Sequence, residues 1–282
     1  MSPRIEVIMA AYNNVRDMRL VFEGYLRQVN KDFTICVTDD GSGPEVKALV
    51  DVYTSLGLSI RYLWQEDEGY RRALALNRAI ESSTAQYIVM TDNDCIPSRY
   101  FIDDYHQLLA ENTMLFGRRV DLYEPASNLI RNHTISLNTM ENPTWLLIQA
   151  FRKGLKRPEM GIRFPSFIFN LLNRKKRGAI GANLAVPRVA LLAVNGFDAD
   201  YEGYGMEETD LVWRLDQAGV IAKTVLSRCA LFHLYHKEKA QSRKAMEMFK
   251  HKRESGRIEC INGINRLSSN TSPLSKQGIS GV

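Results

Sequence analysis

The sequence predicts an α/β fold in which helices flank a mainly parallel central sheet. Before Cys95, a strand-like stretch followed by a helix-like stretch occurs three times, and this alternation is typical of parallel sheets covered on both faces. A fourth apolar stretch ends in Asp92-Asn93-Asp94 and is closed by Pro97, a residue that is unfavourable in a sheet ladder. Carboxylates at the carboxyl end of a strand lie where open α/β sheets bind ligands.

Composition and charge exclude several classes of protein. The 282 residues are 45% hydrophobic and 24% charged, which is ordinary for a soluble globular protein with a large core. No apolar stretch reaches the roughly 18–20 residues of a membrane span, and residues 1–11 do not resemble a signal peptide. The four cysteines have no paired spacing, which is typical of reduced thiols, so we expect a cytoplasmic protein. A net charge of +5 favours anionic partners such as phosphates, nucleic acid or the inner membrane face.

The first third of the chain alternates regularly between the two kinds of element. Strands are expected at 5–10, 33–38, 60–64 and 86–91, and helices at 15–28, from Pro44 to about Ser55, and at 73–82. The turn after the first strand lacks Gly-x-Gly-x-x-Gly, and the chain has no Gly-Lys-Ser/Thr. Neither a dinucleotide-binding oxidoreductase nor a P-loop enzyme is therefore favoured.

Two polar turns in this region are candidate ligand contacts. Asp39 and Asp40 follow the second strand, where one of them could accept the imide hydrogen of a uracil ring. They could equally cap the next helix, because Asp, Ser and Pro commonly begin helices. Arg71 stands at the start of the third helix, where its planar guanidinium suits a diphosphate. It could also be an ordinary surface charge.

The acidic pair after the fourth strand is the strongest candidate site. Residues two apart on an extended chain point the same way and lie roughly 6–7 Å apart, so Asp92 and Asp94 can serve one ligand. Asp94 could hold a divalent cation while Asp92 reaches a sugar hydroxyl of a nucleotide. A solvated turn is the alternative, since Asp and Asn are common turn residues. A phosphatase motif would require glycine where Cys95 stands.

The second half of the chain is less regular. A helix is expected at 99–111 and a strand at 114–122, followed by a proline-containing, basic segment with an apolar run at 164–172. This segment could rest on anionic lipid headgroups, or it could be a solvated helical insertion with its own small core. Further strands are expected at 178–187 and 221–232, a helix from Glu207, and beyond residue 240 a basic helical extension with a flexible tail.

Four ordered motifs in the first half resemble those of family 2 glycosyltransferases with the GT-A fold. They are Ala11-Tyr12-Asn13, Asp39-Asp40-Gly41-Ser42, the stretch from Gly69 through Arg71 to Asn77, and Thr91-Asp92-Asn93-Asp94. The resemblance covers about residues 5 to 240. It implies a glycosyltransferase domain at 1–240, divided into a nucleotide-sugar-binding half (1–118), the basic insertion (119–177) and an acceptor half (178–240), with an extension at 241–282.

The acceptor half is similar to the motif of animal β-1,4-galactosyltransferases. The matching stretches are Gly181-Ala182-Asn183, Asn195-Gly196-Phe197-Asp198 and Gly203-Tyr204-Gly205-Met206-Glu207-Glu208-Thr209-Asp210. The galactosyltransferases carry Trp where Tyr204 stands and a general-base Asp where Glu208 stands. Both exchanges keep the chemistry, an aromatic wall for a sugar and a carboxylate base. Thr209 replaces an acidic residue, which leaves the role of that position open.

The resemblance implies an inverting, metal-dependent transfer of a hexose or N-acetylhexosamine from a UDP-sugar to a saccharide or lipid-linked saccharide, in bacterial surface polysaccharide synthesis. It implies no nucleic-acid partner and a cytoplasmic location, with peripheral contact with the inner membrane face as an option. Mn²⁺ or Mg²⁺ would be the cofactor. His233 would be one of its ligands, and His236 is the alternative for that position. The implied residues are Glu208 as the base, Ala10, Tyr12, Asn13, Asp39, Asp40, Arg71, Asp92 and Asn93 for the donor, Tyr204, Gly205 and Glu207 for the acceptor, and Asp94 and His233 for the metal.

Two other functions compete with this interpretation. A metal-dependent nucleotidyltransferase would also use paired carboxylates and arginines, but it would not need Glu208 and would release pyrophosphate. A non-catalytic nucleotide-sugar-binding protein would be indifferent to the exchange of Glu208 for glutamine.

Overall fold

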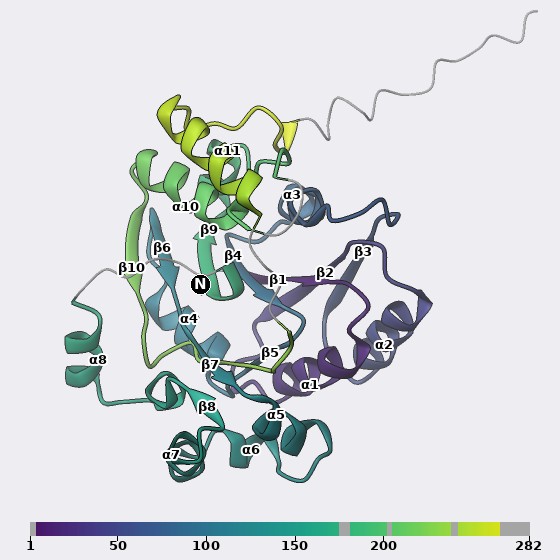
Figure 1. Cartoon of the computed structure of the whole chain (residues 1–282), viewed down its shortest axis with the longest axis vertical. Helices are drawn as coiled ribbons and strands as arrows, with labels where there is room; N and C mark the ends of the chain where they lie inside the picture. Colours follow the sequence, from purple (N-terminus) through teal and green to yellow (C-terminus); the bar gives the residue numbers. More distant parts are fainter. Residues whose placement is uncertain (1–3, 175–180, 202–204, 238–241, 266–282) are drawn as a thin grey trace, which may run out of the picture.

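The computed structural model describes residues 4–174, 181–201, 205–237 and 242–265, and a seven-stranded sheet forms the centre of these residues (Figure 1). The strand order is β10-β6-β9-β4-β1-β2-β3, and β9 alone among these strands runs antiparallel to its neighbours. The predicted mainly parallel sheet is thus confirmed. The strands are β1 (Ile5–Ala11), β2 (Phe33–Asp39), β3 (Ile60–Trp64), β4 (Tyr87–Asp92), β6 (Thr113–Phe116), β9 (Leu184–Pro187) and β10 (Ile221–Thr224).

Helices cover both faces of the sheet because its strands are apolar on both sides. Val7 and Met9 of β1 pack into a core with α1 (Val15–Leu26), α2 (Pro44–Ser55) and α4 (Phe101–Leu108). Ile8, between them, packs into the opposite core, since side chains alternate along a strand. The helices on that second face, above the sheet in Figure 1, are α3 (Arg72–Ser82), α9 (Arg188–Ala193) and α10 (Glu207–Gln217).

A smaller sheet of four strands lies beside the first. It contains parts of two segments that were each predicted to be a single strand. Its order is β5-β11-β7-β8. The strand expected at 114–122 is divided into β6 and β7, and the strand expected at 221–232 into β10 and β11, so each predicted strand contributes to both sheets. The strands of the smaller sheet are β5 (Cys95–Pro97), β7 (Arg119–Leu122), β8 (Leu155–Lys156) and β11 (Leu231–His233).

Asn183 fixes the point where the chain passes from β6 to β7. Its buried side chain donates to the carbonyls of Arg118 (3.0 Å) and Cys229 (2.9 Å) and accepts from the hydroxyl of Tyr105 (2.5 Å). A Cβ at Gly117 would lie 2.1 Å from its amide nitrogen, so only glycine fits there. Asn183 belongs to the short helix η2 (Gly181–Asn183), and the strand expected at 178–187 therefore begins only at β9; residues 178–180 lie outside the described residues.

Pro97 also departs from the expectation that it closes the sheet. It pairs with Leu231 at the end of β5, antiparallel to β11. β5 is an edge strand of the smaller sheet. An edge position tolerates a proline because no neighbouring strand needs a hydrogen bond from its missing N–H. Asp92 and Asp94 nevertheless stand at the carboxyl end of β4, as expected.

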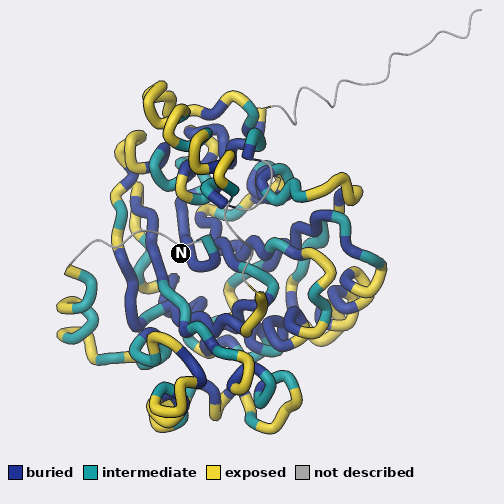
Figure 2. Tube along the Cα trace, in the orientation of Figure 1, coloured by how far each residue is buried: buried dark blue, intermediate teal, exposed yellow. Residues whose placement is uncertain are grey.

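The described part of the basic insertion, residues 119–174, is mainly helical apart from β7 and β8, and it does not form a core of its own. Its helices are α5 (Glu124–Arg131), α6 (Leu137–Met140), α7 (Pro143–Phe151), η1 (Pro158–Gly161) and α8 (Ser166–Leu172). Ile130, Met140 and Leu146 join the same core as α1 and α4. α7 and α8 are largely exposed at the edge of the molecule (Figure 2). No helix among the described residues is long and apolar enough to cross a membrane. α11 (Arg243–Glu254) supplies the helix expected beyond residue 240.

Candidate active site

The carboxyl ends of β1, β2 and β4 meet at one edge of the main sheet and form one side of the site. Ala10 of β1 stands opposite Asp92 of β4, and Ala11 opposite Asp39 of β2. The parallel register thus brings together residues that lie more than 80 positions apart in the chain.

The two aspartates after β2 have different environments. Asp39 is fully buried and accepts hydrogen bonds from the Tyr62 hydroxyl (2.6 Å) and the Ser42 amide (2.9 Å), so it closes the turn before α2. Asp40 borders the solvent and accepts from the side chain of Gln65 (2.6 Å) and the amide of Arg71 (2.7 Å). Burial raises the pKa of Asp40. Of the two carboxylates, Asp40 is the more accessible, at 8% exposed against 0% for Asp39.

Tyr12 and Asn13 form the turn after β1. Asn13 adopts a left-handed backbone (φ 49°), its amide donates to Ser42 Oγ (2.8 Å), and its side chain accepts from Gly43 (3.1 Å). These bonds join the turns after β1 and β2. Tyr12 is half exposed and donates its hydroxyl to Asp67 (2.9 Å). The two turns form a rigid polar rim beside Asp40.

Arg72 is the central cation of the site. The sequence had pointed to its neighbour Arg71 as the contact for a diphosphate. The Nη2 atom of Arg72 donates to Asp92 Oδ1 (2.9 Å), its Nη1 donates to Glu208, and Glu207 Oε1 lies 3.8 Å from Nη1. Burial opposes the charge, but these carboxylates outweigh it and raise the pKa of Arg72. The guanidinium of Arg71 instead contacts Glu68 and the Glu66 carbonyl (2.5 Å).

The first turn of α10 supplies the other side of the site. Gly205 (φ 113°) and Met206 (φ 75°) have left-handed backbones, and the Gly205 amide donates to Glu207 Oε2 (2.9 Å). Tyr70 donates its hydroxyl to the other oxygen of Glu207 (3.2 Å). Burial, followed by the charge of Glu208, raises the pKa of Glu207. Glu207 is almost completely buried, whereas the Glu208 side chain is 23% exposed, so Glu208 is the accessible carboxylate. Tyr204 lies outside the described residues.

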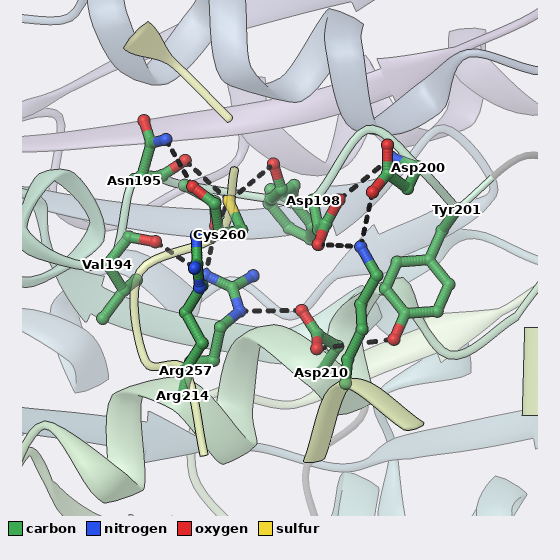
Figure 3. A network of polar contacts seen from close by, with 12 residues as sticks. Val194, Asn195, Asp198, Asp200, Tyr201, Asp210, Arg214, Arg257 and Cys260 are labelled. Atoms are coloured by element: carbon green, nitrogen blue, oxygen red, sulfur yellow. Dashed lines mark hydrogen bonds and ion pairs between the residues drawn. The ribbon is translucent and has the colours of Figure 1, made fainter. Parts of the chain in front are cut away.

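A buried network holds α10 in place (Figure 3). Asp210 accepts from Arg214 Nε (2.7 Å) and from the hydroxyl of Tyr201 (3.4 Å). Arg214 also donates to the carbonyls of Val194 (2.7 Å) and Gly196 (2.8 Å). Asp210 therefore supports the start of the helix by tying it to the preceding loop.

The same network extends into the C-terminal extension, a feature that the sequence did not reveal. Lys252 of α11 binds Asp198 and Asp200, the latter at 2.6 Å. The Asn195 side chain donates to the Cys260 carbonyl (2.7 Å) and accepts from the Asn265 amide (2.9 Å), as Figure 3 shows in part. Residues 242–265 are thus part of the support of α10.

Asp94, His233 and His236 form a candidate metal centre. Asp94 Oδ2 lies 3.3 Å from His236 Nε2 and 3.7 Å from His233 Nε2, and the two imidazole nitrogens are 3.1 Å apart. Burial favours a neutral Asp94, but the two histidines and Arg119 outweigh it and lower the pKa of Asp94. One carboxylate and two imidazoles, with all three ligand atoms within 4.8 Å of one another, fit a transition-metal ion such as Mn²⁺. The structure brings both histidines, which the sequence left as alternatives, to the same carboxylate.

One polar atom beside this centre has no partner. The Nδ2 atom of Asn93 is buried and makes no hydrogen bond to the described residues. A buried donor of this kind is costly unless a ligand or water satisfies it.

Comparison with known proteins places this geometry in a family. Residues 6–180 match the family model described as glycosyl transferase family 2, which is more than half of the 282 residues. The chain belongs to glycosyl transferase family 2. Residues 169–237 of this glycosyltransferase match a second model, described as the N-terminal domain of galactosyltransferase, which agrees with the resemblance noted in its acceptor half.

The curated relatives of this glycosyltransferase include polysaccharide synthases. It is 25% identical over 244 residues to a chondroitin synthase of Escherichia coli, a match that covers 83% of this chain and 34% of that protein. It is 24% identical over 235 residues to a validoxylamine A glucosyltransferase of Streptomyces hygroscopicus subsp. jinggangensis, covering 77% and 52%. A hyaluronan synthase of Pasteurella multocida is 23% identical, covering 83% and 24%. The chain thus spans about half or less of the length of these relatives.

Solved structures confirm the GT-A fold. A mannosyltransferase of Pyrobaculum calidifontis, solved with GDP-mannose and Mn²⁺, matches with a TM-score of 0.56 at 14% identity, covering 97% of this chain and 77% of that one. Residues 1–349 of TarS from Staphylococcus aureus match with a TM-score of 0.56 at 11% identity, covering 82% and 60%. At these identities the likeness is one of fold.

Proposed function

We propose that this glycosyltransferase is an inverting, metal-dependent enzyme that moves a hexose or N-acetylhexosamine from a UDP-sugar to a hydroxyl of a saccharide or lipid-linked saccharide. The observation that carries the proposal is the bridge made by Arg72. Its guanidinium contacts Asp92 at the end of β4 and Glu208 in the first turn of α10. The donor edge and the acceptor helix are therefore one site, with two carboxylates a single guanidinium apart.

The donor would lie along the edge formed by β1, β2 and β4. Asp40 would accept the imide hydrogen of uracil, with Asp39 holding the turn beneath it, and the Tyr12-Asn13 turn would flank the base beside Ala10. Asp92 would bind a ribose hydroxyl, and the unsatisfied amide of Asn93 would donate to the donor. Arg71 would turn toward the diphosphate, because guanidinium pairs well with phosphate oxygens.

Glu208 would act as the general base. The acceptor hydroxyl transfers its proton to a Glu208 oxygen, and the acceptor oxygen forms a bond to the anomeric carbon while the bond from that carbon to UDP breaks. UDP leaves from the opposite face, so configuration inverts in one displacement without a covalent intermediate. Glu207, Gly205 and Tyr204 would contact the acceptor sugar. The rigid attachment of α10 supports this role, because the base must be held in line with the donor.

Asp94, His233 and His236 would hold the divalent cation. When bound, the cation supplies positive charge to neutralise the departing diphosphate. Imidazole nitrogen is a poor ligand for Mg²⁺ and a good one for transition metals, so of the two predicted ions we propose Mn²⁺. The mannosyltransferase of similar fold was solved with Mn²⁺, which is consistent with this choice.

The names of the relatives support a proposal for the acceptor. Chondroitin and hyaluronan synthases are among them, so we propose a growing saccharide chain as acceptor, in bacterial surface polysaccharide synthesis at the cytoplasmic side of the membrane.

Thermal unfolding with a panel of nucleotide sugars, with and without Mn²⁺, tests the donor and the metal together. A UDP-sugar that raises the melting temperature only when Mn²⁺ is present supports the proposal. Product analysis completes the test, because transfer releases UDP whereas a nucleotidyltransferase releases pyrophosphate. Pyrophosphate as the product, or no stabilisation by any nucleotide sugar, would refute the proposed function.

A further inference from the structure

The outer face of α7 exposes large apolar side chains. Phe151 is 91% exposed, Leu147 58% and Ile148 45%. They recur at the spacing of one helix face, while Leu146 and Gln149 on the opposite face are buried. The exposed face is therefore not a consequence of a poorly packed helix, since α7 is anchored to the core by its other side. Figure 2 shows this helix as a largely exposed segment at the lower edge of the molecule.

Basic residues follow this face directly. Arg152, Lys153 and Lys156 are exposed, and residues 142–157 contain no Asp or Glu. None of these three cations takes part in an ion pair among the described residues, although Lys156 lies 5.4 Å above the ring of Tyr123. In the docking surface so defined (Leu147, Ile148, Phe151, Arg152, Lys153 and Lys156), apolar side chains thus stand beside unneutralised positive charge.

We propose that this docking surface binds the surface of an anionic lipid bilayer. Insertion of Leu147, Ile148 and Phe151 to the level of the headgroups would remove them from water, and the neighbouring cations would meet lipid phosphates. A second copy of the chain suits the surface poorly. Two such faces would bring like charges together, and one nine-residue helix offers less than the roughly 800 Å² per partner of a stable interface.

The position of the surface in the fold gives the attachment a use. In the register of the smaller sheet, Lys156 of β8 stands opposite Asp121 of β7, and Asp121 stands opposite His233 of β11. The docking surface and the candidate metal centre therefore share one small sheet. A bilayer bound at α7 would hold the active site at a fixed height above the membrane, where a lipid-linked acceptor is presented. This last consequence rests on the proposed function, but the binding itself does not.

Vesicle flotation tests the binding without donor, metal or acceptor. We expect the protein to bind vesicles of phosphatidylglycerol and phosphatidylcholine in equal parts, and to bind phosphatidylcholine alone at least tenfold more weakly. Leu147→Ser/Phe151→Ser should weaken binding to the anionic vesicles at least tenfold, because burial of one such side chain is worth about that factor. Arg152→Gln/Lys153→Gln should weaken it by a similar factor, and more so at low salt.

Matched controls lie on other parts of the surface. Leu56, at the end of α2, is 59% exposed, close to the value for Leu147, and Leu56→Ser should bind as the wild type does. Arg243, 90% exposed on α11, serves the same purpose as Arg243→Gln. Absence of binding to anionic vesicles, or binding unaffected by Leu147→Ser/Phe151→Ser, would overturn the proposal. So would a dimer in sedimentation that the same double substitution abolishes. Any of these results would leave the transferase proposal intact.

Discussion

Replacing Arg72 by glutamine should damage both stability and transfer. The side chain is only 13% exposed and holds Asp92 and Glu208 together, with Glu207 nearby. Its removal leaves three carboxylates facing one another without a counter-charge. Breaking a buried ion pair by removing one partner typically costs about 3–5 kcal/mol. Because Glu208 and Asp92 retain partial contact with water, at 23% and 30% exposed, we expect the low end, about 3 kcal/mol in the free energy of unfolding.

The effect on transfer follows from the proposed role of Glu208 as the base. Without Arg72, repulsion moves Glu208 away from the donor edge, and a misplacement of about 1 Å can lower a rate roughly 10²-fold. Urea unfolding measures the first effect, and kcat for transfer at saturating UDP-sugar measures the second. Arg72→Lys keeps the charge but cannot span both carboxylates, so it should fall between the wild type and Arg72→Gln in both measurements.

Arg61→Gln separates the two effects. Arg61 makes a bidentate pair with buried Glu6, at 2.9 and 3.1 Å, in the strands rather than at their carboxyl ends. This variant should lose stability while keeping the kcat of the wild type. If Arg72→Gln proved as stable and as active as the wild type, the idea that one guanidinium joins the donor edge to the acceptor helix would be refuted.

Three further outcomes are expected. Glu208→Gln should lower transfer by about 10²–10⁴ while stabilisation by the nucleotide sugar persists, and undiminished transfer would exclude Glu208 as the base. His233→Ala and His236→Ala should each raise the dissociation constant for Mn²⁺, measured by titration of the free ion, at least tenfold; a variant without this effect would remove that histidine from the metal centre. The raised pKa of Glu207 means that the folded state binds this proton more tightly than the unfolded state. The wild type should therefore lose stability as pH rises above the ordinary glutamate pKa of 4.5 and through the folded pKa. Glu207→Gln should lack this component, and parallel stability curves for the two proteins would contradict it.

The sequence was sufficient to predict the elements from residue 5 to residue 92, because the signals there are local. Apolar runs of strand length alternate with amphipathic stretches up to Asp92, and each element there lies within two or three residues of its expected place. The acidic motif could be placed at a strand end for the same reason. Its convergence with Glu208 rested on family resemblance, since no local pattern relates positions 116 residues apart.

The predictions that were wrong depended on contacts distant in sequence. The residues at 114–122 contain no signal that the strand is interrupted. The interruption is made by the side-chain amide of Asn183, which lies beside Gly117 but is distant in the sequence. The contacts of Arg72 were missed for a similar reason, because Arg71 and Arg72 are the same residue type and adjacent in sequence, and the donor contact predicted for Arg71 stays a prediction. Only the start of α3 decides that Arg72 faces the carboxylates while Arg71 contacts Glu68.

The interlocking of residues 242–265 with the loop before α10 has a practical consequence for chimeric enzymes. A chimera that exchanges the proposed acceptor segment with that of a relative has to keep these contacts matched. Here the carbonyls and amides around Asn195 are matched to Cys260 and Asn265, and Lys252 is matched to Asp198. A transplanted segment should therefore run from residue 181 through residue 265. A shorter segment would place a new loop before α10 against an extension whose contacts match the original loop.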